Sequence, residues 1–261
     1  MTLPTYDGYI FDLDGTIYLG DALLPASQHV ITTLRARGRR VAFLSNNPTH
    51  TCQHYAAKLT RLGIITAPDA IVNSSYVLVQ WLRAHAPQAH LYVVGETPLI
   101  EELTTAGFHL SEQPGDITFV VASFDRTFSY YKLQVAFDAI RAGAQLIATN
   151  ADRYCPVPGG GQPDAAAVIA AIEACTGTTC MQVVGKPSPI MARTVGELLG
   201  VPPERCLMIG DRLETDILMG LQAGMSTALV LTGATSRVDL VATTYQPHYV
   251  LEGLHQLLST T

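Results

Sequence analysis

The sequence predicts an α/β protein whose parallel sheets are covered by helices on both faces. Apolar runs of strand length recur along the chain, and amphipathic stretches of helical period lie between most of them. Several of these stretches end in glycine, which is typical of helix C-termini. Because strands that alternate with helices pair in parallel, the strands are expected to be buried on both faces.

Eight strands are predicted from short apolar runs bounded by polar or glycine-containing turns. In chain order they are GYIFDLD (8–14), RRVAFLSNN (39–47), HLYVVGE (90–96), ITFVVASF (117–124), AQLIATN (144–150), MQVVGK (181–186), RCLMIGD (205–211) and TALVLTG (227–233). The helices are predicted from apolar residues that repeat every three or four positions. They are ASQHVITTLRARG (26–38), HTCQHYAAKLTRLG (50–63), TPLIEELTTAG (97–107), YYKLQVAFDAIRAG (130–143) and PIMARTVGELLG (189–200).

Composition excludes several classes of protein. The chain has 261 residues, enough for one large domain or two, and its 48% hydrophobic and 15% charged residues exclude a disordered protein. Its net charge is -6, and its one basic run, RARGRR (35–40), falls at a predicted helix end, so nucleic acid is not an expected partner. An anionic substrate would therefore need a local positive site.

The N-terminus and the cysteines predict a cytoplasmic protein without a membrane segment. MTLPTYDGY has neither a basic stretch nor an apolar core, and nowhere do about 18 apolar residues run together. The five cysteines are widely spaced and form no CxxC pair, so no disulfide framework or zinc site is expected.

Polar residues gather at the predicted carboxyl ends of four strands. Open parallel sheets bind ligands beyond these ends, so this is where a site is expected. The residues there are Asp12, Asp14, Ser45, Asn46, Asn47, Lys186 and Asp211, with Asp216 five positions further on.

Each of these motifs has a purely structural explanation when taken alone. DLDGT (12–16) fits a strand that runs into an Asp-Gly turn, and Ser45 with its two asparagines fits a helix cap. Lys186 fits a solvated strand end, and GDRLETD (210–216) fits a capped helix start. The structural explanations do not account for all four motifs in one chain, each directly after an apolar strand.

Carboxylates clustered at one sheet edge repel one another unless a hard cation joins them. Oxygen ligands of this kind suit Mg²⁺, which keeps waters and substrate phosphate in its coordination shell, and Asp12 and Asp211 are the predicted ligands. Lys186, the Ser45 hydroxyl and backbone N–H groups then suit a dianionic phosphate.

The pair of aspartates suggests phosphate ester hydrolysis, in which positioning and charge neutralisation dominate. Asp12 would attack phosphorus to form an aspartyl-phosphate. Asp14 would protonate the leaving alcohol and then take a proton from the water that opens the intermediate. Side chains two positions apart on a strand point to the same face, which places both carboxyls at one reacting centre.

These motifs resemble those of the haloacid dehalogenase (HAD) superfamily of phosphatases. DLDGT, the Ser45 strand end, Lys186 and GDRLETD match its four motifs in order. The resemblance implies a Rossmann-like parallel-sheet core, with Asp12 as nucleophile and Asp14 as acid and base. It also implies Mg²⁺ held by Asp12, Asp211 and the Asp14 backbone carbonyl, Asp216 supporting the metal site from behind, and phosphate held by Ser45, Asn46 and Lys186.

The similarity extends to the NagD-like, nitrophenylphosphatase subfamily across nearly the whole chain. The matching segments are YLGDALLPAS, FLSNNPTHT, SFDRTFSYYKL, IATNADRY, VGKPSP, MIGDRLETDI and TALVLTGATS, whereas CPVPGGGQPDA (155–165) departs from many relatives. This resemblance implies a hydrolase core of residues 1–74 and 184–261 with an inserted α/β cap of residues 75–183, which is expected to cover the site and read the leaving group.

Substrate and assembly are expected only by class. The resemblance implies a sugar phosphate, nucleotide, phosphoglycolate or pyridoxal phosphate as substrate, and a homodimer formed through the cap. The candidate cap contacts are Asp125, Arg126, Asn150, Asp152, Arg153 and Tyr154, for each of which a surface turn or a helix cap is an equal alternative.

Other functions stay open from the sequence. A non-enzymatic phospho-acceptor also uses aspartate and lysine at a sheet edge, although it needs no general base such as Asp14. A dehalogenase should lack the second aspartate, and a phosphonate-cleaving enzyme would need a cap lysine, for which Lys132 is the one candidate.

Overall fold

A computed structural model describes residues 3–157 and 160–258 of the chain. The chain folds into two compact units. Unit 1 comprises Met1–Ser45, Cys52–Val72 and Lys186–Thr261, and unit 2 comprises Asn46–Thr51 and Asn73–Gly185. The segment predicted as an inserted domain lies within unit 2, which also includes the short stretch Asn46–Thr51 that follows Ser45.

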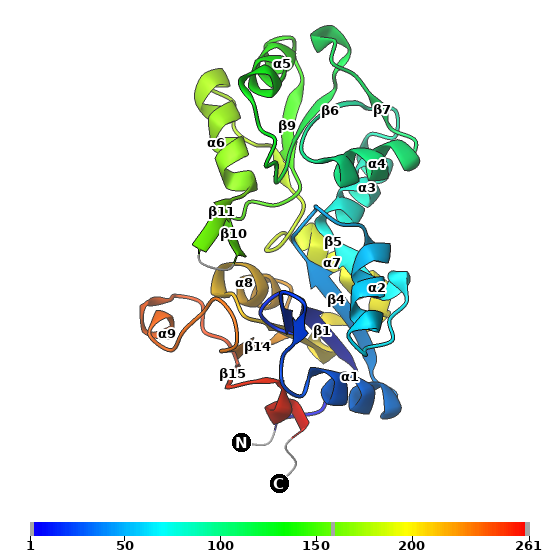
Figure 1. The fold of residues 1–261 in the computed structure, drawn as a ribbon, viewed down its shortest axis with the longest axis vertical. Helices are drawn as coiled ribbons and strands as arrows, with labels where there is room; N and C mark the ends of the chain where they lie inside the picture. The colour runs from blue at the N-terminus through cyan, green and yellow to red at the C-terminus, as the bar shows by residue number, and fades with distance from the viewer. Residues whose placement is uncertain (1–2, 158–159, 259–261) are drawn as a thin grey trace. The chain divides into compact units, whose positions relative to one another are not determined.

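Unit 1 is built on a six-stranded sheet with the order β15-β14-β13-β1-β4-β5 (Figure 1). Its strands are β1 (Gly8–Asp12), β4 (Arg40–Ser45), β5 (Ile71–Asn73), β13 (Cys206–Gly210), β14 (Ser226–Val230) and β15 (Tyr249–Leu251). Strand β1 pairs in parallel with both β13 and β4, and all five of its residues are buried, as expected for a central strand of a parallel sheet. The order reverses between β1 and β13, which makes this the topological switch point of the sheet.

The helices of unit 1 connect these strands. They are α1 (Ser27–Ala36), α2 (Cys52–Arg61), α7 (Pro189–Leu199), α8 (Leu218–Gln222) and α9 (Asp239–Ala242). Buried residues recur on one side of each long helix, for example Val30, Ile31 and Leu34 on α1. A short antiparallel hairpin, β2 (Tyr18–Leu19) with β3 (Ala22–Leu23), follows β1 directly.

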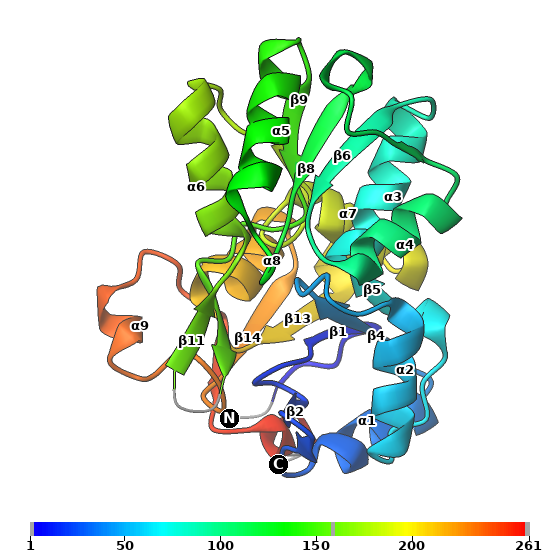
Figure 2. The same cartoon turned by 45° about the horizontal axis from the view of Figure 1, so that its top comes forward.

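Unit 2 contains a second parallel sheet, with the order β12-β9-β8-β6-β7 (Figure 2). Alternate residues of its central strands, among them Tyr92, Val120 and Leu146, pack with α5 and α6 in one apolar cluster. The sheet extends from β6 to β7 on one side and from β6 through β8 and β9 to β12 on the other. Because crossovers between parallel strands are right-handed, α4, which connects β6 and β7, is expected on the face opposite α5 and α6. The elements are α3 (Ser74–His85), β6 (His90–Val94), α4 (Thr97–Thr105), β7 (His109–Leu110), β8 (Phe119–Ala122), α5 (Tyr130–Arg141), β9 (Gln145–Ala148), α6 (Ala165–Thr176) and β12 (Gln182–Val183).

All eight predicted strands and all five predicted helices are confirmed, with ends that shift by up to three residues. The sequence patterns did not predict α3 and α6, which carry apolar residues on more than one face, or the hairpin of β10 (Tyr154–Val157) and β11 (Gly160–Pro163). They also did not predict the short elements β2, β3, β5, β7, β15 and α9. This hairpin covers most of the divergent stretch 155–165, of which residues 158 and 159 lie outside the described residues. Among the described residues, none of the helices has the length and apolar character needed to cross a bilayer.

Candidate active site

The site of unit 1 begins where its two switch-point strands end. Asp12 is the last residue of β1, and Asp211 directly follows β13. Neighbouring parallel strands bring their carboxyl ends to the same edge, so residues 199 positions apart in the sequence become neighbours. One carboxylate oxygen each from Asp12, Asp211 and Asp216 lies within 4.8 Å of the others, and all three residues are buried.

Lys186 is the positive centre of this cluster. Its Nζ donates to Asp12 Oδ1 at 2.5 Å and to Asp216 Oδ1 at 2.7 Å, and the lysine is only 3% exposed. Burial alone would lower the pKa of Lys186, but Asp12 and Asp216 together raise it above its usual range. The ammonium group therefore stays charged, and it offsets part of the negative charge around Asp12.

Burial also dominates the pKa of Asp12. Desolvation raises this pKa well above its usual value, Lys186 opposes the rise, and the carboxylates of Asp216 and Asp211 add to it. The cluster thus holds more negative charge than one lysine neutralises.

A π-helical turn, Leu213–Ile217, places Asp216 under the end of β13. The backbone N–H of Arg212 donates to Asp216 Oδ2 at 3.1 Å, so both carboxylate oxygens of Asp216 accept hydrogen bonds from the protein. A Cβ atom on Gly210 would lie 2.3 Å from the Asp216 side chain, so only glycine fits there. Turns of this type occur frequently at functional sites.

The Asp211 carboxylate fits a metal ligand. Its Oδ2 accepts from the Ala234 backbone N–H at 2.6 Å, while its buried Oδ1 has no hydrogen-bond partner among the described residues. Burial and the Asp216 charge raise the pKa of Asp211 to about 6. A buried oxygen without a donor, beside two further carboxylates, suits a hard divalent cation such as Mg²⁺.

Asp14 lies just beyond β1 and is exposed on unit 1. Tyr18 Oη donates to Asp14 Oδ2 at 3.4 Å, and the Lys58 ammonium group lies 3.8 Å from the centre of the Tyr18 ring. Neither partner was predicted from the sequence. Tyr18 could have been found four positions after Asp14, whereas Lys58 on α2 comes close only through the fold.

The two residues predicted to bind phosphate at the end of β4 fall in different units. Ser45 is the buried last residue of β4, and Asn46 belongs to unit 2. There the Asn46 Nδ2 donates to Asp152 Oδ2 at 2.8 Å, and the Ser74 hydroxyl donates to the Asn46 carbonyl at 2.6 Å.

The candidate contacts of unit 2 separate into buried and exposed residues. Asn150 is fully buried and Asp152 is half-buried, whereas Arg153 and Tyr154 are exposed. The other two candidates belong to ion pairs within unit 2. Asp125 accepts from Lys132 Nζ at 2.6 Å, and the Arg126 guanidinium donates two hydrogen bonds to Glu96, each at 2.7 Å.

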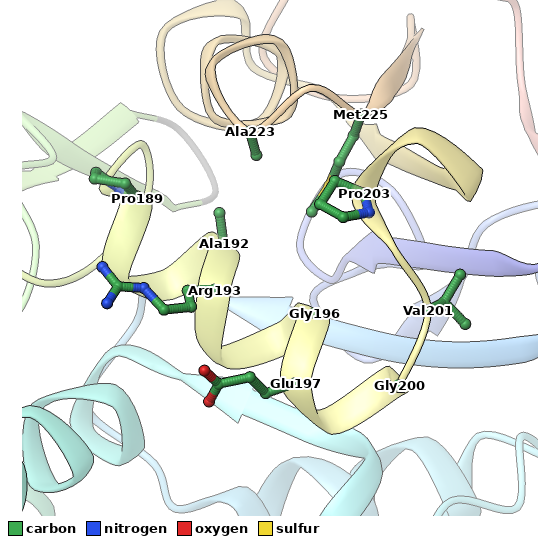
Figure 3. A pocket seen from close by; sticks show the side chains of 10 residues that line it. All are labelled: Pro189, Ala192, Arg193, Gly196, Glu197, Gly200, Val201, Pro203, Ala223 and Met225. Atoms are coloured by element: carbon green, nitrogen blue, oxygen red, sulfur yellow. The ribbon is translucent and has the colours of Figure 1, made fainter.

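A separate apolar cavity of about 450 Å³ lies along α7 in unit 1 (Figure 3). Ala192 and Gly196 line its floor, and Ala223 and Met225 face them from the end of α8 and beyond. None of the carboxylates of the cluster lines this cavity, so the polar strand ends are the candidate active site.

Comparison with known proteins identifies the family of the chain. Residues 9–109 match the family described as haloacid dehalogenase-like hydrolase, and residues 183–257 match the HAD-hydrolase-like family. The sugar-phosphatase AraL of Bacillus subtilis is 38% identical over 95% of this chain and 90% of its own. The 5'-nucleotidase YutF of the same organism is 32% identical over 97% of both chains.

Solved structures share the whole architecture. The 4-nitrophenylphosphatase of Thermotoga maritima has a TM-score of 0.92 and 36% identity, over 97% of this chain and 96% of its own. NagD from E. coli K-12 has a TM-score of 0.88 and 29% identity, over 98% of this chain and 99% of its own. The chain is therefore a phosphatase of the haloacid dehalogenase-like hydrolase family and belongs to its NagD-like subfamily.

Proposed function

We propose that this protein hydrolyses small-molecule phosphate monoesters through an aspartyl-phosphate on Asp12. The observation that carries the proposal is the 2.5 Å hydrogen bond from Lys186 to Asp12 inside a buried carboxylate cluster. The lysine orients one oxygen of Asp12 and supplies positive charge where a phosphoryl group would bring negative charge.

The reaction divides between the two aspartates of the first motif. An oxygen of Asp12 attacks phosphorus in line, the bond from phosphorus to the ester oxygen breaks, and Asp14 gives its proton to the leaving alcohol. Asp14 then takes a proton from water, whose oxygen attacks the same phosphorus and releases inorganic phosphate and a free Asp12. The exposure of Asp14 suits this role, because alcohol and water must both reach it.

We propose that Asp12, Asp211 and the Asp14 backbone carbonyl hold Mg²⁺. Bound there, the ion would offset negative charge on the phosphoryl oxygens. The buried Asp211 oxygen without a donor supports this assignment. Asp216 already accepts hydrogen bonds at both oxygens, which supports its role as a residue that holds the cluster in place without touching the ion.

The substrate is proposed by class. Two of the relatives are named as a sugar phosphatase and a dihydroxyacetone phosphatase, and another as a 5'-nucleotidase. We propose that unit 2 is the cap that reads the leaving group and that the substrate is a sugar phosphate, a nucleotide, phosphoglycolate or pyridoxal phosphate. A cytoplasmic location and a homodimer formed through unit 2 stay predictions, the second of which sedimentation of the purified protein tests.

Phosphate release from these four classes of ester tests the proposed function. Activity is expected with Mg²⁺, is expected to vanish with EDTA and to return with added Mg²⁺. Asp12→Asn should lower kcat by about 10³-fold or more, because the amide is a poor nucleophile. The control is Asp69→Asn, which neutralises an exposed carboxylate of the same unit outside the cluster. Near-normal turnover by Asp12→Asn would overturn the mechanism.

A further inference from the structure

A chain of hydrogen bonds in unit 2 joins the two segments that continue directly into the proposed phosphate contacts. Asn46 follows Ser45, and Gly185 precedes Lys186, so each is one peptide bond away from a residue of the core site. At both points the chain passes from one unit to the other. What holds Asn46 and Gly185 together therefore also limits where Ser45 and Lys186 can lie.

Asp152 is the acceptor that fixes Asn46. Its Oδ2 accepts from Asn46 Nδ2 at 2.8 Å and from Asn150 Nδ2 at 2.9 Å. Asn150 is fully buried, and its Nδ2 also donates to Asp164 Oδ1 at 3.1 Å. Hydrogen bonds to a charged acceptor are the stronger kind, so the orientation of the Asn46 carboxamide is tightly set.

Gly185 is the last member of this chain of hydrogen bonds. Its N–H donates to the Thr149 carbonyl at 2.7 Å, in the residue before Asn150. A Cβ atom on Gly185 would lie 2.5 Å from that carbonyl oxygen and 2.7 Å from Asn46 Oδ1. The Asn46 carboxamide thus packs directly against the Gly185 backbone, at a distance that no larger residue allows.

We propose that Asp152 is a positioning residue: through Asn46 and Gly185 it sets the spacing of Ser45 and Lys186, and so the affinity of the site for a phosphoryl group. This inference rests on the proposed function and on the prediction that Ser45, Asn46 and Lys186 hold the phosphate. It assigns to Asp152 a role different from contact with the leaving group, because its Oδ2 is already occupied by two amide donors of unit 2.

The test compares Asp152→Ala, which removes the acceptor, with Asp152→Asn, whose carbonyl oxygen can still accept from both amides. Three quantities are measured with Mg²⁺: kcat/KM for p-nitrophenyl phosphate, kcat/KM for a sugar phosphate, and the inhibition constant of inorganic phosphate. Inorganic phosphate has no leaving group, so it separates a phosphate-positioning role from a leaving-group contact. Ser129→Ala, which removes the cap of α5 in the same unit, controls for a general loss of stability.

Asp152→Ala should lower kcat/KM for both esters by about 10 to 100-fold, because misplacement by about 1 Å has effects of this size. It should raise the inhibition constant of inorganic phosphate by a similar factor. Asp152→Asn should stay within about threefold of the wild type, which is the rescue expected for a hydrogen-bonding role. Gly185→Ala should also raise the inhibition constant of inorganic phosphate, because the added methyl group disturbs the contact between Gly185 and the Asn46 carboxamide.

Three outcomes would overturn the inference. They are normal phosphate affinity in a folded Asp152→Ala variant, equal losses in the alanine and asparagine variants, and a loss confined to one ester. If Asp152→Ala does not fold, Asp152→Glu decides by the same criteria, since it keeps the charge but displaces the acceptor. A wild-type protein that releases no phosphate from any ester would instead overturn the proposed function, and the inference with it.

Discussion

At the scale of single residues, Lys186 shows how this site balances burial against charge. A lysine that is 3% exposed persists because two carboxylates accept its hydrogen bonds. Removing one partner of such a buried group costs far more than the pair contributes, since uncompensated charge stays behind. Lys186 therefore stabilises unit 1 as well as the proposed phosphoryl group.

Lys186→Met should lower the free energy of unfolding by about 3 to 5 kcal/mol at pH 8 in EDTA. The loss should shrink toward pH 5. Without the lysine, the pKa of Asp12 rises further above its unfolded value near 4, so the folded state binds the proton more tightly. Stability is then regained as the pH falls through the raised pKa.

Urea unfolding of the wild type and of Lys186→Met at pH 8 and pH 5 measures this loss of stability. The matched control is Arg61→Met, which removes a cation of unit 1 whose ion pair with Asp21 is exposed on both sides. Equal destabilisation of Lys186→Met at pH 5 and pH 8 would show that the carboxylates do not repel one another as argued.

At the scale of elements, the end of β13 and the turn after it act together. The strand ends at Gly210 because the π turn returns Asp216 against its Cα, within a distance that excludes any side chain. The same turn lets the Arg212 N–H bind Asp216 Oδ2. Helical propensity alone does not predict such a turn, because its geometry depends on a carboxylate buried beneath a neighbouring strand.

Gly210→Ala should destabilise the protein by about 1 to 3 kcal/mol, as overpacking of a filled core does. It should also weaken Mg²⁺ binding, because the added methyl group displaces Asp216 and the lysine that holds it. Thermal unfolding and calorimetric Mg²⁺ titration measure the two effects. Gly196→Ala on α7 is the control, since a Cβ there meets no atom within 4 Å. A Gly210→Ala protein with unchanged Mg²⁺ affinity would contradict this account of the turn.

At the scale of the whole molecule, two parallel sheets with different strand orders share one chain. The buried carboxylates whose mutual repulsion lowers stability, Asp12, Asp211 and Asp216, belong to unit 1. A ligand that binds only the folded state stabilises it by mass action. Metal binding should therefore register in the unfolding of the protein as well as in its activity.

Mg²⁺ at a hundredfold excess over its dissociation constant should stabilise the wild type by about 2.7 kcal/mol and raise its Tm. Asp211→Asn should abolish this shift and the activity. In EDTA the same variant should be at least as stable as the wild type above pH 6. The pKa of Asp211 is raised to about 6 in the folded state, so its ionised form opposes folding there. Measurement of Tm with and without Mg²⁺ tests this prediction. If Mg²⁺ raised the Tm of Asp211→Asn as much as that of the wild type, the metal would bind elsewhere.

Sequence alone determined the α/β class, eight of the strands and five of the helices, and the group of residues that could form a site. These features follow from local periodicity and from the rule that parallel strands present their carboxyl ends at one edge. Asp12, Lys186, Asp211 and Asp216 could be brought together on paper because each directly follows, or lies just beyond, an apolar run.

Only the tertiary structure decided which partner each polar atom has. The contact of Lys58 with Tyr18, the commitment of both Asp216 oxygens, and the contact of Asn46 with Asp152 join residues that are distant or unrelated by any periodic pattern. The physical reason is that periodicity records which face of an element is buried, whereas hydrogen bonds and pKa shifts depend on distances between elements that only packing sets.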